Sequence, residues 1–134
     1  MVMKYLNRYT VFAVFLTAIV LMTGCRKRSI NGDLDGQWQI MEITLADGTV
    51  ENPEQYYYCL YLHTVNLTNV KGAMITGNME YGGNTLTLKF PTNEASSMLR
   101  WGIDAKETTF EVKHLSHSGM TLHSDYATIE FRKF

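Results

Sequence analysis

Histidine is the residue type with the most potential for chemistry in this chain, because imidazole binds metals and transfers protons near neutral pH. Of the four histidines, His114 and His123 flank the dipeptide Ser118-Gly119. If that dipeptide is a two-residue turn, the two imidazoles face each other with Cβ atoms about 5 Å apart, close enough to share a zinc ion. No carboxylate or thiolate stands at ligand spacing, and a longer turn would separate the pair. We therefore favour ordinary surface histidines and expect no metal.

Motifs of the common enzyme classes are missing from the chain. There is no Gly-x-Ser-x-Gly, no glycine-rich phosphate loop and no His-Glu-x-x-His. Several carboxylates could in principle pair for acid–base work, but no spacing singles out a pair among Glu42, Glu80, Asp104, Glu107 and Glu111. We expect a protein without enzymatic activity and without a cofactor.

Cys25 is the cysteine whose surroundings indicate a modification. The residues before it, Leu21-Met22-Thr23-Gly24, resemble the lipobox of bacterial lipoprotein signal peptides. Lys4 and Arg8 supply the positive start, and the apolar run Val11–Met22 is shorter than the roughly 20 residues of a membrane span. The resemblance implies that residues 1–24 are a helical signal peptide and that Cys25 carries a diacylglycerol after cleavage. The alternative is an ordinary signal peptide.

Charge along the rest of the chain narrows the range of partners. Residues 25–33 form a polar tether that includes Arg26-Lys27-Arg28, whereas the chain from Ser29 onward carries seven basic against thirteen acidic residues. Such a balance lacks the basic footprint that nucleic-acid binding needs. The basic triplet either contacts anionic headgroups or stays solvated. We expect a protein held on the bilayer through acylated Cys25, facing the periplasm from the outer membrane.

The segment Tyr56–Leu62 is unusually aromatic. Alternation places Tyr56 and Tyr58 on one face of a strand and Tyr57 and Tyr61 on the other. One face must be core, and the other is either an exposed contact patch or is covered by residues 91–101. Cys59 has no disulfide partner once Cys25 is acylated, and we expect a buried, inert thiol.

The elements that must position these residues are β-strands, because the chain after residue 33 alternates apolar and polar residues between turn signals. The predicted strands are residues 37–45, 56–68, 73–81, 85–90, 108–115, 120–123 and 126–134. The second is long enough to bend into two, and residues 94–99 predict about one helical turn. Short consecutive connections favour an up-and-down antiparallel barrel, with a curved β-sandwich as the alternative. The predicted core comprises Trp38, Ile40, Leu86, Leu88, Phe90, Val112, Leu122, Ile129 and Phe131.

The start of the first strand, Leu34-Asp35-Gly36-Gln37-Trp38, resembles the Gly-x-Trp motif of lipocalins. The resemblance implies a lipocalin-like barrel over residues 34–134, closed at one end by Trp38 with a basic residue, Arg132 or Lys133, packed on it. Together with the lipobox, the chain resembles lipocalin-like lipoproteins of Gram-negative gut bacteria, a group largely without assigned function. It differs from typical lipocalins in its shortness and in ending on its last strand.

Two functions follow from this resemblance as hypotheses. The first is a non-enzymatic binding lipoprotein that takes a small apolar or amphipathic ligand at the barrel mouth, through Tyr56, Tyr58, Tyr81 and Trp101. Trp101 would be either a lid there or a plug, and we favour the plug because Met98-Leu99 beside it is apolar. A short barrel can instead be filled by its own side chains. The second hypothesis is then a structural lipoprotein that docks a protein partner through the Tyr56–Tyr61 face.

Overall fold

Alternating side chains along nearly every strand build an all-β domain in the computed structural model, which describes residues 10, 13–14 and 30–134. Cys25 and most of the predicted signal peptide and tether lie outside the described residues. No helix within the described part is long and apolar enough to span a membrane. The elements are η1 Gly32–Leu34, β1 Gly36–Leu45, β2 Val50–Glu51, β3 Tyr56–Tyr61, β4 Thr64–Asn69, β5 Met74–Gly82, β6 Thr85–Lys89, η2 Ala95–Trp101, β7 Glu107–Leu115, β8 Gly119–His123 and β9 Ala127–Lys133.

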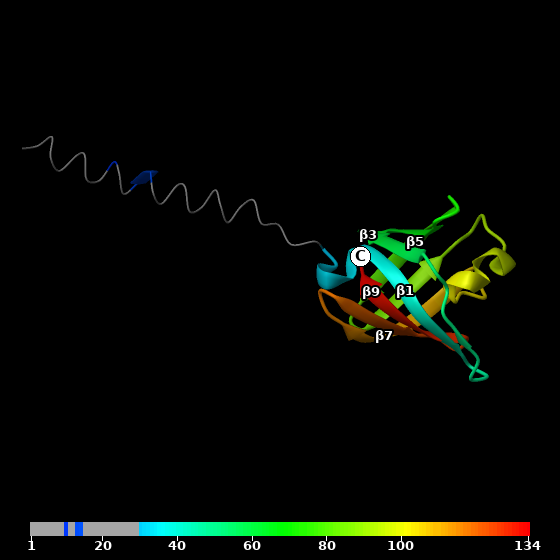
Figure 1. Cartoon of the computed structure of the whole chain (residues 1–134). Helices are drawn as coiled ribbons and strands as arrows, with labels where there is room; N and C mark the ends of the chain where they lie inside the picture. Colours follow the sequence, from blue (N-terminus) through cyan, green and yellow to red (C-terminus); the bar gives the residue numbers. More distant parts are fainter. Residues whose placement is uncertain (1–9, 11–12, 15–29) are drawn as a thin grey trace, which may run out of the picture.

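The sheet closes on itself, which decides for the barrel over the sandwich. From β3 to β9 each strand pairs antiparallel with the next, and β1 pairs with β3 on one side and with β9 on the other. The β1–β9 seam runs from Trp38↔Lys133 to Leu45↔Ala127, so the eight strands β1 and β3–β9 form a closed antiparallel barrel (Figure 1). Closure leaves no long free edge. The short strand β2 pairs only with the second half of β1.

The predicted strands match the observed ones to within two residues at most ends. The exception is the segment 56–68, which is a hairpin, with Tyr61 paired to Thr64. Leu62 turns the chain at φ 55°, a conformation that few non-glycine residues adopt. The segment, which was long enough to bend into two strands, thus forms two antiparallel strands, β3 and β4. The additional strand completes the eight of the barrel.

Large side chains fill the barrel. Trp38, Tyr58, Phe90 and Phe110 are fully buried together with aliphatic neighbours from nearly every strand. This burial is the main favourable contribution to folding, since each large apolar side chain removed from water contributes about 1.5–3 kcal/mol. All nine core residues predicted from alternation are buried: Trp38, Ile40, Leu86, Leu88, Phe90, Val112, Leu122, Ile129 and Phe131.

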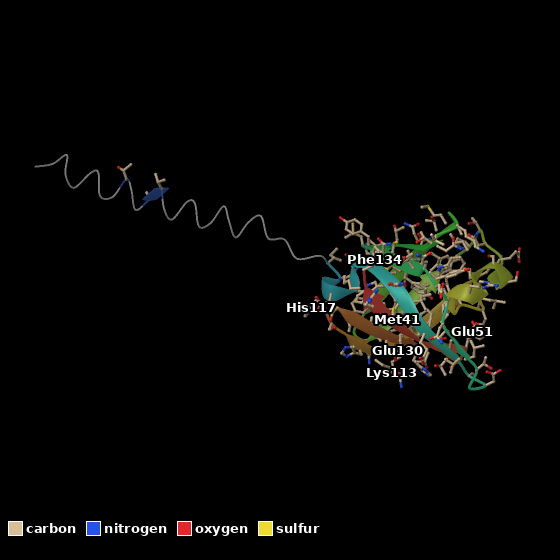
Figure 2. All side chains as sticks on the ribbon, viewed as in Figure 1. Met41, Glu51, Lys113, His117, Glu130 and Phe134 are labelled. Atoms are coloured by element: carbon tan, nitrogen blue, oxygen red, sulfur yellow. The ribbon has the colours of Figure 1, made fainter. Side chains whose placement is uncertain are left out.

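The two ends of the barrel differ in what covers them. In an up-and-down meander every second connection lies at the same end. One end, here called the base, holds η1 and the turns at residues 62–63, 83–84 and 116–118. The other, here called the mouth, holds the loops 46–55, 70–73, 90–106 and 124–126. Figure 2 shows His117 at the base and Glu51 toward the mouth.

Candidate binding site at the barrel mouth

Three of the four aromatic residues predicted to bind a ligand meet at the mouth. The Tyr58 hydroxyl donates a hydrogen bond to the backbone carbonyl of Trp101. The Tyr56 ring stands edge-on to the Trp101 ring, with centroids 4.9 Å apart. The Trp101 indole Nε1 donates to the Thr68 carbonyl at 3.0 Å. The polar groups of Tyr58 and Trp101 are thus bonded to backbone carbonyls of the protein itself. Tyr58 is wholly inside the barrel, where burial raises the pKa of its hydroxyl well above the ordinary value.

Helix η2 closes the mouth as a plug. Met98, Trp101 and Ile103 are buried against the barrel core. Gly102 ends the helix at φ 77°, and its backbone N–H donates to the Leu99 carbonyl at 3.0 Å. A Cβ at position 102 would lie 2.6 Å from Ile129 Cδ1, so any larger residue would have to displace the Ile129 side chain. The position of Trp101 is therefore set by its own packing and by the left-handed turn behind it.

Tyr81, the fourth predicted residue, lies elsewhere. It pairs with Leu86 next to the β5–β6 turn, where Gly82 pairs with Thr85. That turn belongs to the base, because strands β5 and β6 run the length of the barrel between it and the mouth. Tyr81 therefore cannot join Trp101 in one site.

Open clefts surround the plug. One of about 440 Å³ is lined by Glu51, Asn52, Pro53, Leu99, Arg100 and Tyr126. Another of about 300 Å³ shares Arg100 and is lined by Glu54, Gln55, Tyr56, Asn69, Val70 and Lys71 as well. A third, of about 450 Å³, lies on the far side of the 52–55 loop against the outer part of β1. The mouth thus offers grooves on its rim. Ile40 is the one fully buried residue that lines these three clefts, and Tyr56 and Tyr126 are partly buried against the core.

Charge at the rim is mainly negative. Partial burial raises the pKa of Tyr126, and the carboxylates of Glu51, Asp104 and Asp47 raise it further in that order. Arg100 is an exposed cation between two of the clefts. Ion pairs between described residues are confined to Lys89, with Glu80 and Glu107, so no described carboxylate lies within ion-pair distance of the Arg100 guanidinium.

The rim residues Glu51–Pro53 and Tyr126 were not predicted from sequence. The sequence did contain information that places these residues together, because alternate connections of a meander lie at the same end of the barrel. That rule brings the loops 46–55 and 124–126 beside the 90–106 connection without any knowledge of side-chain positions.

The basic residue on Trp38 is Lys133 rather than Arg132. Lys133 pairs directly with Trp38, and its Nζ lies 4.8 Å from the centroid of the indole and donates to the Asp33 carbonyl at 2.9 Å. Arg132 points outward and donates to Gln39 Oε1. Gly36, at φ 142°, leaves room for the Lys133 side chain, since a Cβ there would overlap Lys133 Cε. Gly36 and Trp38 of the Gly-x-Trp motif thus form the surface on which the Lys133 side chain packs.

His114 and His123 do not face each other, because Ser118-Gly119 is not the two-residue turn on which that arrangement depended. The turn is centred one residue earlier than Ser118-Gly119, since the Ser116 N–H donates to the Gly119 carbonyl. A bulge between Val112 and His114 shifts the register further. His114 lies opposite Thr121, and His123 lies opposite Glu111. Among the described residues no group of three or more His, Cys, Asp or Glu could hold a metal.

The outer face of β3 remains uncovered by η2. Tyr57 is half-buried against the Phe134 ring, with centroids 5.3 Å apart, and Tyr61 is exposed. Cys59 lies between them on this outer face and is half-buried, with its sulfur 4.0 Å from Thr68 Oγ1. The expectation of a buried thiol is therefore wrong, because Tyr58 and Leu60 take the inward positions of this strand.

Comparison with known proteins points to one family. A family model described as a lipocalin-like domain matches residues 20–134. The structure of a lipocalin-like protein from Bacteroides uniformis ATCC 8492 superposes with a TM-score of 0.64 at 26% identity, covering 77% of this chain and 100% of that one. An uncharacterized protein from Bacteroides eggerthii DSM 20697 shares the fold, with a TM-score of 0.58 at 19% identity over 75% of this chain and 98% of that one. No curated protein matches the chain.

Proposed function

Since the chain belongs to the lipocalin-like domain family, whose fold commonly binds small hydrophobic ligands, we propose that it is a non-enzymatic binding lipoprotein for a small amphipathic ligand. The ligand binds on the rim of the mouth, around η2. Cys25 holds the domain on the outer membrane, facing the periplasm. The lipobox at residues 21–25 supports this placement.

The observation that carries the proposal is Arg100 at the junction of two clefts. Its guanidinium has no carboxylate partner among the described residues and offers five donors to an anionic or hydrogen-bonding head. Leu99, Pro53 and the Tyr126 ring offer an apolar wall in the same cleft. A polar head and an apolar body on one ligand match this division.

The filled interior favours the rim over a deep pocket. Tyr58, which the sequence placed in the site, occupies the barrel core and is bonded to the plug. A ligand would reach the interior only after η2 had left the mouth and Trp101 had lost its contacts with Tyr56 and Thr68.

The test is a titration of the purified protein with the amphipathic fluorescent anion anilinonaphthalene sulfonate, followed by displacement with palmitate. We expect Arg100→Ala to weaken probe binding roughly tenfold or more, because a hydrogen bond to a charged group contributes about 1.5–3 kcal/mol. The matched control is Lys113→Ala, which removes an exposed cation toward the base. Equal affinities of Arg100→Ala and the parent chain would refute the role of the rim.

A second candidate function is docking of a protein partner through the Tyr56–Tyr61 face. The same packed interior favours it, since a filled barrel needs no ligand to be stable. Native mass spectrometry of protein purified from its own host separates the two functions. A co-purifying small molecule supports rim binding, whereas a stoichiometric protein companion supports docking.

A further inference from the structure

The base of the barrel carries a group of exposed apolar side chains, here called the base patch: Ile30, Tyr61, Leu62 and Phe134. We propose that the base patch rests in the headgroup region of the membrane, so that the domain stands base-down with its mouth turned away. This orientation rests on the proposed acylation of Cys25 and adds to it which residues meet the lipid.

The members of the base patch lie at or next to the ends of elements that meet at the base: Tyr61 ends β3, Leu62 follows it, Phe134 follows β9, and Ile30 precedes η1. The Phe134 N–H donates to the Gln37 carbonyl at 2.8 Å, and Gln37 pairs with Cys59 across the β1–β3 ladder. Tyr61 follows two residues after Cys59, on the same outward face and roughly 7 Å further along β3. Tyr61 and Phe134 are 67% and 70% exposed. Figure 2 shows Phe134 close to the first described part of the domain.

The path of the chain brings the lipid anchor to this patch. Asn31 Nδ2 donates to the Leu62 carbonyl at 2.8 Å, so the chain reaches the barrel against the tip of the β3–β4 hairpin. Only Arg26–Ser29 separate Cys25 from Ile30, which limits their Cα separation to about 18 Å. Strand β1 alone spans roughly 30 Å from base to mouth, so the tether cannot bring the mouth to the bilayer while the base stays away.

The chemistry of the two ends agrees with this direction. Tyrosine suits the membrane interface because its ring is apolar and its hydroxyl stays hydrated. Arg26-Lys27-Arg28 would meet anionic headgroups beside the patch. The mouth carries Glu51, Asp104 and Asp47 close enough to act on Tyr126, and an anionic surface repels that end. Four exposed side chains are also few beside the 20 or so residues per side of a stable protein interface.

The experiment uses the full acylated chain, purified in detergent and reconstituted into phosphatidylethanolamine–phosphatidylglycerol vesicles with or without brominated acyl chains. Flotation first establishes whether the chain is bound. Phe134→Trp then places an indole in the base patch, and Met74→Trp places one at an equally exposed site (68%) near the mouth. The unaltered chain corrects for Trp38 and Trp101. We expect bromine to quench roughly half of the emission added at position 134 and almost none of that added at position 74.

Each outcome decides something. Replacing Tyr61 and Leu62 by serine in the Phe134→Trp chain should lower the quenching, whereas replacing Val70, which is 65% exposed near the mouth, should not. A chain that floats but shows no quenching at position 134, or stronger quenching at position 74, overturns the orientation and leaves the anchor intact. A chain that does not float overturns the anchor and the orientation with it.

Discussion

At the scale of single residues, the base of the barrel depends on how three side-chain positions fit together. Trp38 fills the end of the barrel, Lys133 lies across its ring, and Gly36 leaves the space through which the lysine passes. The ammonium group also donates a hydrogen bond to the Asp33 carbonyl in η1. One side chain therefore joins the last strand, the first strand and the segment that leads to the tether.

Removing that lysine should destabilise the domain more than removing its neighbour. We expect Lys133→Ala to lower the free energy of unfolding by about 1–2 kcal/mol, through the lost cation–π contact, the lost bond to η1 and the lost packing of its stem. Arg132→Ala should change it by no more than about 0.5 kcal/mol, since Arg132 is exposed. Urea titration measures both. Equal effects would show that Lys133 has no special role.

Tyr58 should make the fold sensitive to alkali. Its hydroxyl is neutral in both states below the ordinary tyrosine pKa of about 10. Above that pH the unfolded chain releases the proton while the folded chain, whose pKa is raised by burial, keeps it, so stability falls as pH rises. Tyr58→Phe should cost about 1 kcal/mol at neutral pH, because the Trp101 carbonyl loses its donor, and should flatten the alkaline decline. Urea titrations of the parent chain and of Tyr58→Phe at neutral and at alkaline pH measure the effect. An equal loss of stability with rising pH in the two chains would contradict this prediction.

At the scale of elements, η2 is stabilised by its packing on the barrel core rather than by its own hydrogen bonds. A seven-residue 3-10 helix has little intrinsic stability, and buried Met98 and Trp101 fix it to the core. Gly102 permits the sharp exit that brings Ile103 back to the wall. The state of the mouth therefore depends on a few contacts that a single substitution can test.

Gly102→Ala and Gly48→Ala form a matched pair. Both glycines have positive φ, so alanine should cost about 1 kcal/mol at each position. At position 48 nothing lies within 4 Å of a new Cβ, whereas at position 102 it meets Ile129 Cδ1 at 2.6 Å. We expect a further loss of about 1–3 kcal/mol at position 102 from overpacking, measured by urea titration. An equal loss of unfolding free energy at the two sites would mean that η2 and Ile129 move aside without cost.

At the scale of the whole molecule, the barrel has a polarity that a membrane anchor would use. The chain enters the barrel at the base, where Asn31 contacts Leu62. The clefts and their carboxylates lie at the mouth, and η2 stands between the clefts and the core. If Cys25 is acylated as proposed, this arrangement would turn the clefts toward the periplasm and bring the base patch to the lipid.

The anchor itself is tested by Cys25→Ser. We expect this chain to yield no membrane-bound protein at the mature mass, since serine cannot accept the diacylglycerol. Cys59→Ser is the control, because it removes the other thiol and should leave acylation, processing and membrane association unchanged. Cell fractionation with mass spectrometry of each fraction gives the readout. Mature Cys25→Ser protein in the membrane would exclude acylation as the anchor.

The sequence alone determined most strand positions and the core, because these depend on local geometry. A strand exposes alternate residues to opposite faces, so Leu86, Leu88 and Ile129 were assigned to the interior without knowledge of their partners. The same alternation places Lys133 on the inner side with Ile129 and Phe131, and it would have selected Lys133 over Arg132. The lipobox is also a contiguous pattern, and the acylation of Cys25 that it predicts stays a prediction.

Only the tertiary structure decided which side chains from different strands and loops contact one another. The separation of His114 from His123 comes from a turn centred one residue earlier and from a bulge, and neither is encoded by residue type alone. Tyr58 is core rather than ligand site because closure of the barrel brings Trp101 onto it. The base patch arises because the β3–β4 hairpin, the C-terminus and the tether share one end. Such contacts depend on the closed sheet as a whole, and no local pattern contains them.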